Sequence, residues 1–266
     1  MTLKSSATTN DERIAVAVSH LTVRLGETNV VDDVSFEVAR GAVAAIIGPN
    51  GAGKTTLLKA ILGLIPAASG TAAIFGLKID EVRARVAYVP QRFDFDRSFP
   101  LTVTEFMALR CPNCSVKEAE KALKEVGLMP AILDKRLGDL SGGQLQRALI
   151  AQAIIHEPQV LFLDEPASGI DIVGEAAFYG VLEHLKQEHG TTIMLVSHDL
   201  SVLANFVDVV ICLNHDLVCY GPPSEAITHS TLNKLFGSRA HLFDHLTVEH
   251  RQHHPAENEH HGHDTH

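Results

Sequence analysis

Short, wholly apolar runs recur along the chain and are separated by longer amphipathic segments. The runs 43–47, 160–163, 192–196 and 209–213 each have the length of a buried strand. Strands that are apolar on both faces are typical of a parallel sheet with helices on both sides, so the pattern predicts an α/β fold with a mostly parallel core sheet. Residues 13–47 alternate before they become wholly apolar, which predicts further strands ahead of the first buried one.

Helical periodicity fills most of the intervals between these runs. Helices are predicted over residues 55–62 and 174–188, and residues 100–156 are predicted to be mostly helical. Within that block, Ser115–Glu118 has the spacing of a capping box, and Gly127 is placed as a C-terminal stop. Because the block interrupts the alternation of strands and helices, we expect it to form an inserted helical subdomain.

Composition and charge narrow the possible functions. The 266 residues are 45% apolar and carry a net charge of −10, which argues against a nucleic-acid partner and against docking on anionic lipid through a basic patch. No apolar run approaches the ~18 residues of a membrane span, and the first residues lack the apolar core of a signal peptide. We therefore expect a cytosolic chain whose four cysteines stay reduced.

Two of these cysteines have C-x-x-C spacing. Cys111 and Cys114 have the separation of a metal-binding or redox pair. Because no second pair lies nearby, a structural or incidental role is favoured over metal binding and over redox chemistry.

The strongest local motif follows the first buried run. Residues 48–55 read GPNGAGKT and match the phosphate-loop pattern G-x-x-x-x-G-K-[ST], between a predicted strand and a predicted helix. Lys54 is expected to reach the β- and γ-phosphates of a nucleotide, and the Thr55 hydroxyl to ligate Mg²⁺. The full set of nucleotide-binding residues predicted here is Gly48, Pro49, Asn50, Gly51, Ala52, Gly53, Lys54, Thr55 and Thr56.

Polar residues follow two other buried runs. Asp164 and Glu165 end the run at 160–163, at the sheet edge where open α/β folds bind ligands. Asp164 is expected to hold Mg²⁺, and Glu165 to deprotonate the attacking water. His198 follows the run at 192–196 and is a candidate partner of the γ-phosphate.

The segment 140–144, LSGGQ, completes a set of motifs that occur in a defined order. With the phosphate loop, Gln91, Asp164-Glu165 and His198, it resembles the ATP-binding cassette (ABC) ATPases. The resemblance implies a P-loop NTPase fold with an N-terminal antiparallel β part and an inserted helical subdomain at about 100–156. It also implies three segments: a flexible terminus (1–12), the ATPase domain (13–237) and a His-rich tail (238–266).

Further roles are implied by this resemblance. Gln91 would contact Mg²⁺ or water and couple to a membrane partner, and Asp171 would face a second protomer. In a homodimer, one chain would present Ser141, Gly142, Gly143 and Gln144 to the nucleotide of the other. The family usually has an aromatic ring near the position of Leu25 to stack on adenine, and this chain departs from that pattern.

Among ABC proteins, residues 13–237 most resemble the ATPase subunits of bacterial zinc importers. The residues that carry this resemblance include 99–103, 197–200, 212–215 and 235–237. It implies ATP hydrolysis at the cytoplasmic face of the inner membrane, membrane permease subunits as partners, and an external metal-binding protein acting indirectly. Manganese or iron import is the first alternative, and a soluble ABC ATPase outside transport is the second.

The tail contains chemistry of its own. Nine of the last 26 residues are histidine, and neutral imidazole is a good ligand for Zn²⁺. The candidate ligands are His253, His254, His260, His261 and His263. The alternative is a solvated tail that holds no metal.

Overall fold

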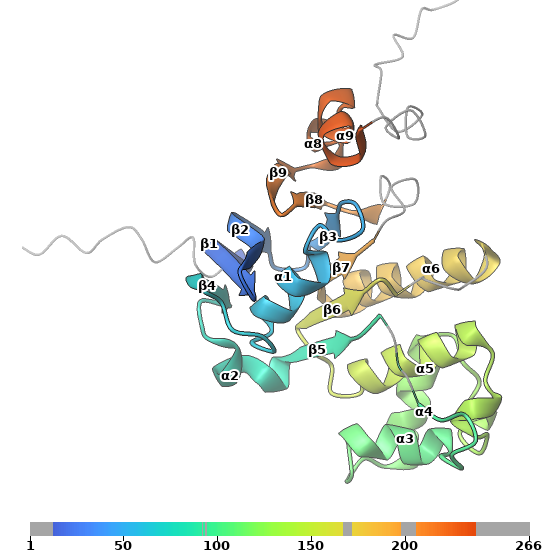
Figure 1. Ribbon diagram of the computed structural model, residues 1–266. Coiled ribbons are helices and arrows are strands. Elements are labelled where there is room, and N and C mark those ends of the chain that lie inside the picture. The colour runs from blue at the N-terminus through green and yellow to red at the C-terminus, as the bar shows by residue number, and fades with distance from the viewer. Residues whose placement is uncertain (1–12, 92, 94, 167–171, 198–205, 238–266) are drawn as a thin grey trace, which may run out of the picture.

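The computed structural model describes residues 13–91, 93, 95–166, 172–197 and 206–237 (Figure 1). The strands are β1 (Ile14–Leu25), β2 (Thr28–Ala39), β3 (Val43–Ile47), β4 (Ser69–Ile74), β5 (Val86–Val89), β6 (Val160–Asp164), β7 (Thr192–Val196), β8 (Val209–Asn214) and β9 (Asp216–Gly221). The α-helices are α1 (Lys54–Ile61), α2 (Ile79–Val82), α3 (Val103–Arg110), α4 (Val116–Glu125), α5 (Gly142–Ile154), α6 (Ile172–His189), α8 (Pro223–Ala226) and α9 (His229–Phe236). Short 3₁₀ helices are η2 (Arg83–Arg85), η3 (Pro130–Ile132) and η4 (Leu137–Asp139).

The strands form two sheets. Six strands in the order β5-β6-β7-β3-β8-β9 form the core sheet, in which β9 alone runs antiparallel to its neighbour. The other sheet is antiparallel, in the order β2-β1-β4. The predicted mostly parallel core and N-terminal antiparallel part are therefore confirmed.

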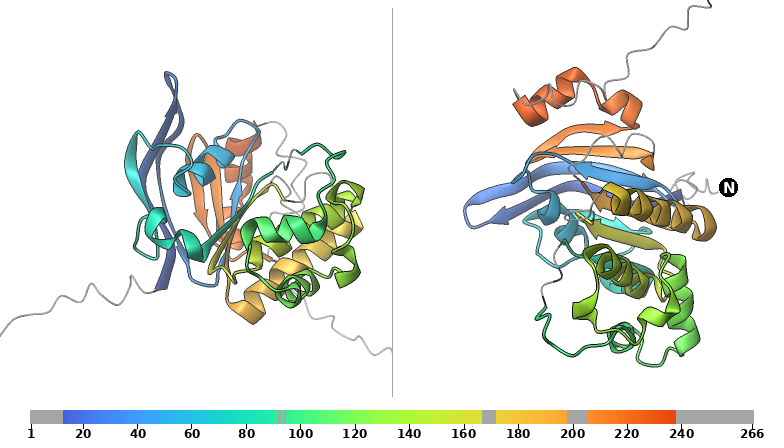
Figure 2. Two further views of the ribbon diagram at one scale, coloured as in Figure 1. Left: turned by 90° about the horizontal axis from the view of Figure 1, so that it is seen from below. Right: turned by 90° about the vertical axis from the view of Figure 1, so that its right-hand side faces the viewer.

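Each face of the core sheet packs against a different layer, as Figure 2 shows. On strand β3, Val43, Ala45 and Ile47 belong to a core shared with α3 to α6, α8 and α9. The intervening Ala44 and Ile46 belong to a second core with α1 and the antiparallel sheet. Alternate side chains of a strand point to opposite faces, so burial on both faces explains why the central strands are apolar throughout.

Helices α3, α4 and α5 lie together beside the β5 edge of the core sheet (Figure 1). They fall within the predicted block 100–156, and three capping boxes fix helix starts at Thr102, Ser115 and Ser141. Each of these side chains accepts a hydrogen bond from the backbone N–H three residues later, which satisfies an otherwise unpaired donor. Gly127 has φ = +68°, a backbone conformation that favours glycine at a helix end.

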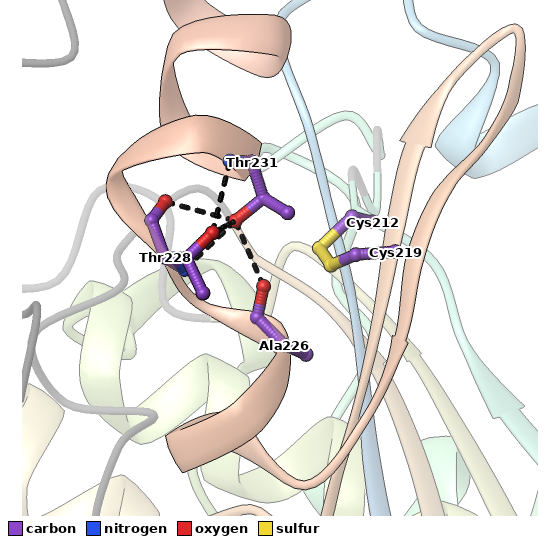
Figure 3. Close-up of a disulfide and its surroundings, with 5 residues drawn as sticks. All are labelled: Cys212, Cys219, Ala226, Thr228 and Thr231. Carbon is purple, nitrogen blue, oxygen red and sulfur yellow. Dashed lines mark hydrogen bonds between the residues drawn. A yellow bond between two sulfur atoms is a disulfide. The ribbon is translucent and has the colours of Figure 1, made fainter.

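The C-terminal part of the described chain contains elements that the sequence did not indicate. Strand β9 pairs with β8 at one edge of the core sheet. Helices α8 and α9 pack against these two strands. Thr228 starts α9, where its hydroxyl accepts a hydrogen bond from the N–H of Thr231 at 3.2 Å (Figure 3). The apolar positions of α9, Leu232 and Leu235, are buried in the core.

The expectation of reduced cysteines is wrong for this structure. Cys212 on β8 is bonded to Cys219, which lies opposite it on β9 (Figure 3), and Cys111 is bonded to Cys114. The Cα separations, 4.8 and 5.3 Å, lie in the usual disulfide range of about 4.4–6.8 Å. Cross-strand pairing and a tight turn place the thiols within bonding reach of each other, a proximity that an argument from compartment does not consider.

None of the helices in the described ranges is long and apolar enough to cross a membrane.

The helical subdomain has an aromatic centre, which gives a test of its stability. Phe106 on α3 is 1% exposed and contacts Phe93 edge to face with ring centroids 5.4 Å apart. We expect Phe106→Ala to lower the free energy of unfolding by about 3–5 kcal/mol, because the cavity cannot close around the lost ring. Urea unfolding followed by circular dichroism measures it. Leu109→Ala on the same helix, where the side chain is 68% exposed, is the control and should change little; equal losses in both variants would contradict the packing argument.

Candidate functional site

The site is built at the C-terminal end of β3, where the chain turns into α1. Gly48 and Gly53 border the turn with φ = +156° and +93°. A Cβ atom at Gly48 would collide with the carbonyl oxygen of Leu213, and one at Gly53 with that of Val30. The backbone is therefore wedged between β8 and β2, and only glycine fits at both ends of the loop. This close packing fixes the loop in front of the N-terminus of α1, a position that favours anions.

Lys54 is the first residue of α1 and is held over the loop. Its ammonium donates hydrogen bonds of 3.0 Å to the carbonyl oxygens of Gly48 and Pro49, and the residue is 6% exposed. Burial lowers the pKa of Lys54 below its ordinary 10.5, against the raising influence of Glu165 and Asp164. The side chain is thus a buried cation aimed along the phosphate loop.

Asp164 joins strand β6 to helix α1. Its Oδ1 accepts a 2.8 Å hydrogen bond from the hydroxyl of Thr55, and the residue is 1% exposed. Burial raises the pKa of Asp164 above its ordinary 3.8, although the Thr55 hydroxyl favours the charged form. Burial and the charge of Asp164 also raise the pKa of Tyr88 to about 12.

This arrangement fits a magnesium ion. Mg²⁺ prefers oxygen ligands, and it is commonly held by one or two protein oxygens together with nucleotide phosphates and water. The Thr55 hydroxyl and the Asp164 carboxylate present two such oxygens next to the phosphate loop. A buried carboxylate with a raised pKa also gains from a cation, which favours its charged form.

Glu165 and Gln91 lie together across the loop. The Gln91 amide donates a 2.5 Å hydrogen bond to Oε2 of Glu165. Glu165 itself has φ = +45°, and its N–H donates to the carbonyl of Val196 on β7 at 3.1 Å. A non-glycine residue in this conformation is uncommon and is typical of functional positions. The backbone aims this carboxylate away from the strand and toward the loop.

A pocket of about 440 Å³ connects these groups. It is lined by Val30, Asn50, Gly51, Ala52, Gly53, Lys54, Thr55, Thr56, Gln91 and Glu165. The structure thus brings the predicted phosphate loop together with the predicted water-activating residues, and Asp164 reaches the same place through Thr55.

The predicted nucleotide-binding residues of the LSGGQ segment lie elsewhere. Ser141, Gly142, Gly143 and Gln144 begin α5 in the helical subdomain and do not line this pocket. Ser141 and Gln144 form a capping box: the Ser141 hydroxyl accepts from the Gln144 N–H at 3.3 Å, and the Gln144 side chain accepts from the Ser141 N–H at 3.2 Å. The start of the helix is therefore ordered by its own side chains.

Several predicted residues lie outside the described part of the chain. They are His198, Asp171 and the tail histidines His253, His254, His260, His261 and His263. Leu25 is described, and it is 52% exposed at the β1–β2 turn and is not among the lining residues.

Two contributors were missed by sequence reasoning. Val30 lines the pocket, and His215, in the turn between β8 and β9, fastens the loop to β2. The N–H of His215 donates to the carbonyl of Ala52 at 3.0 Å, and its Nδ1 lies 3.2 Å from the carbonyl oxygen of Val30. Contacts to backbone carbonyls such as these form no motif in the sequence, although the positive φ of His215, +69°, marks the turn in the structure.

Known proteins resemble the chain at the level of sequence. Residues 31–168 match the family model described as ABC transporter. A zinc import ATP-binding protein, ZnuC, of Cereibacter sphaeroides is 43% identical over 84% of this chain and 88% of its own length. The ZnuC of Yersinia pestis is 38% identical over 85% of this chain and 86% of its own length. The ZnuC of Pseudomonas fluorescens is 37% identical over 90% of this chain and 87% of its own length.

Solved structures resemble it in fold. CbiO1 of Clostridium perfringens, part of the ABC transporter complex CbiONQ, aligns with a TM-score of 0.73 at 26% identity, over 88% of this chain and all of its own. The structure of an inward-facing conformation of a putative metal-chelate type ABC transporter aligns with a TM-score of 0.74 at 25% identity. The alignment covers 84% of this chain and 89% of the other.

The buried carboxylate gives a test that separates stability from function. We expect Asp164→Asn to keep the Thr55 hydrogen bond and to raise the free energy of unfolding of the nucleotide-free protein by on the order of 1 kcal/mol, because a buried charge is removed. Magnesium-dependent nucleotide binding should weaken at the same time. Thermal unfolding with and without Mg²⁺ and ATP measures both effects.

The pH dependence of this gain has a defined sign. The pKa of Asp164 is higher in the folded protein than in the unfolded chain. The carboxylate charge therefore destabilises the fold at pH values above the pKa of the unfolded chain, and it has no effect on stability at pH values below it. The advantage of Asp164→Asn should therefore be largest near neutral pH and vanish as the pH falls below about 3.8. An advantage that persists unchanged at that pH would contradict this explanation.

Proposed function

The chain belongs to the ABC transporter family, and we propose that within it the protein is the ATP-hydrolysing subunit of an importer that brings zinc ions across the cytoplasmic membrane. The assignment of ATP hydrolysis is supported by one observation: two hydrogen-bonded pairs, Thr55 with Asp164 and Gln91 with Glu165, lie around one phosphate loop. Zinc as the imported ion is supported by the 37–43% identity to proteins named for zinc import.

Binding of the nucleotide follows from the loop and Lys54. Backbone N–H groups of the glycine-rich turn and the N-terminus of α1 receive the phosphates. Lys54 exchanges its two backbone carbonyl partners for the β- and γ-phosphate oxygens. Thr55 and Asp164 would hold Mg²⁺, which when bound neutralises charge that develops on the transferred phosphoryl group.

Hydrolysis is assigned to Glu165 with Gln91. We assign Glu165 as general base: its carboxylate takes the proton of a water in line with the γ-phosphate. The Gln91 amide, already bonded to Oε2 of Glu165, holds the carboxylate and orients that water. His198 is proposed to bind the γ-phosphate from the end of β7.

The second half of the site is proposed to come from another copy of the chain. Ser141 and the following glycines begin α5 away from the pocket, and a capped helix N-terminus is suited to bind an anion. In a twofold dimer each chain would offer this segment to the nucleotide of its partner. Asp171 is proposed to face the second protomer between the two sites.

The remaining partners follow from the importer assignment. The Gln91 loop and α3 to α5 are proposed to contact a membrane permease on its cytoplasmic face, with an external metal-binding protein acting through that permease. The net charge of −10 remains unfavourable to nucleic acid. The tail histidines are proposed as zinc ligands, and deletion of residues 249–266 without change in zinc binding or transport would remove that proposal.

Glu165→Gln tests the general-base assignment. The amide keeps the shape of the side chain but accepts no proton, so we expect hydrolysis to fall about 10²–10⁴-fold while ATP binding persists. ATP should then hold the variant as a dimer, measured by light scattering alongside phosphate release. Glu188→Gln, on the exposed side of α6, is the matched control and should behave as wild type. Normal turnover of Glu165→Gln would exclude this residue as the base.

Metal uptake tests the transport assignment. Cells lacking the chain should regain uptake of labelled zinc with the wild type and not with Glu165→Gln, and excess manganese should not compete. Manganese or iron uptake restored in place of zinc would leave the ATPase chemistry intact and replace the imported ion. If uptake of all three metals is unaffected, the chain acts outside metal transport, as a soluble ABC ATPase would.

A further inference from the structure

A cluster of metal-ligand side chains lies on the surface far from the nucleotide pocket. Glu125, His184 and His189 each direct one ligand atom into the same space, and these atoms all lie within 4.8 Å of one another. Oε2 of Glu125 is 2.7 Å from Nε2 of His184 and 3.3 Å from Nε2 of His189. The three side chains are partly exposed, so an ion can reach them from solution.

The spacing suits a small tetrahedral ion. Ligand atoms bound at about 2.0–2.1 Å in a tetrahedron lie roughly 3.3–3.4 Å apart. The Glu125–His189 separation of 3.3 Å matches this value, and the Glu125–His184 separation of 2.7 Å is shorter, so an ion can be seated once His184 moves away from the carboxylate. Two imidazoles and one carboxylate are a ligand set that zinc-type ions prefer and Mg²⁺ does not.

The local field also favours a cation. Glu125 is the last residue of α4, and His189 is the last residue of α6. The C-terminal end of a helix carries partial negative charge, which disfavours a carboxylate there and favours a positive ion. Glu157, which lines a surface pocket together with Glu125 and His189, adds a further carboxylate, although Lys121 pairs with it at 2.6 Å.

The histidines already act on the carboxylate in place of a cation. Burial alone would raise the pKa of Glu125, and the hydrogen bonds from His184 and His189 outweigh it and hold that pKa below 4.5.

The cluster connects two parts of the fold that are remote in sequence. α4 belongs to the inserted helical subdomain, whereas α6 follows the catalytic carboxylates and covers the core sheet; the two helices are in contact (Figure 1). A pocket of about 370 Å³ borders Glu125 and His189 and leaves room for a water or another ligand in the fourth position. Zinc sites with three protein ligands hold a water or another small ligand in the fourth position, whereas closed structural sites have four protein ligands.

We propose that Glu125, His184 and His189 form a binding site for a divalent ion of the zinc type, which fastens α4 to α6. The site does not depend on which metal the importer carries. A bound ion ties the helical subdomain to the helix that leads out of the hydrolytic site, so its occupancy restrains movement between them.

A second cluster, Cys111, Cys114 and His156, lies nearby. Its two sulfur atoms are bonded to each other in this structure, so they offer no thiolate to a metal. His156 therefore provides the matched control, because it borders the same pocket as Glu125 and His189 without belonging to their cluster.

The test uses the full chain without nucleotide, under non-reducing conditions, with Zn²⁺ added at increasing concentration. We expect zinc to raise the thermal unfolding midpoint by several degrees, because a site formed only in the folded state stabilises that state. Hydrogen exchange should slow in the last turns of α4 and α6. Histidines that bind zinc equally in folded and unfolded chains give no such shift, so tail binding does not mimic it.

Three variants decide the result. His184→Gln with His189→Gln should weaken zinc binding at this site at least tenfold and abolish both effects, whereas His156→Gln should retain them. The double variant's midpoint without zinc shows that it folds, and Glu125→Gln gives an independent loss of the same ligand set. Mg²⁺ at equal concentration should leave all chains unchanged. Undiminished stabilisation in the double variant, loss only in His156→Gln, or no stabilisation of the wild type would overturn the proposal.

Discussion

The hydrogen bond between Thr55 and Asp164 is the contact on which the organisation of the site depends. It joins the first turn of α1 to the end of β6, two elements separated by more than a hundred residues along the chain. The bond holds a buried carboxylate beside a phosphate loop that is itself wedged between β8 and β2. Burial of that charge without a cation is unfavourable, so the fold carries an instability that a bound metal relieves.

Much of this could be predicted from sequence, because the responsible signals are local. Strands buried on both faces are wholly apolar, and the phosphate loop requires glycine at fixed positions for steric reasons that Gly48 and Gly53 show directly. Other contributors have no such signal. His215 contacts Ala52 through its main-chain N–H, which any residue type can offer, and Val30 through its imidazole, which a lone histidine in the sequence does not announce. The pairing of Cys212 with Cys219 depends on β9, an element that periodicity did not indicate.

Contacts between distant segments set the other limit of sequence reasoning. Glu125 and His184 are 59 residues apart and lie on different helices, α4 and α6. In the sequence, each residue alone is an ordinary polar position on a helix. Only the packing of α4 on α6 brings the two side chains close enough to share a ligand. The LSGGQ segment shows the converse. Residues Ser141 to Gln144 are conspicuous in the sequence, yet in the single chain they begin and cap a helix and do not line the nucleotide pocket.

These placements together divide the chain into a part that holds nucleotide and a part that responds to it. The phosphate loop follows β3, and Asp164 and Glu165 stand at the end of β6 in the same sheet. Gln91 lies in the segment that leads to α3, and its amide donates a hydrogen bond to Glu165. The contact between Glu165 and the segment that leads to α3 is thus a polar one outside the apolar core. The packing of α4 on α6 is a second connection between the same two parts. In our proposal, an ion at Glu125, His184 and His189 would strengthen that second connection without touching the nucleotide.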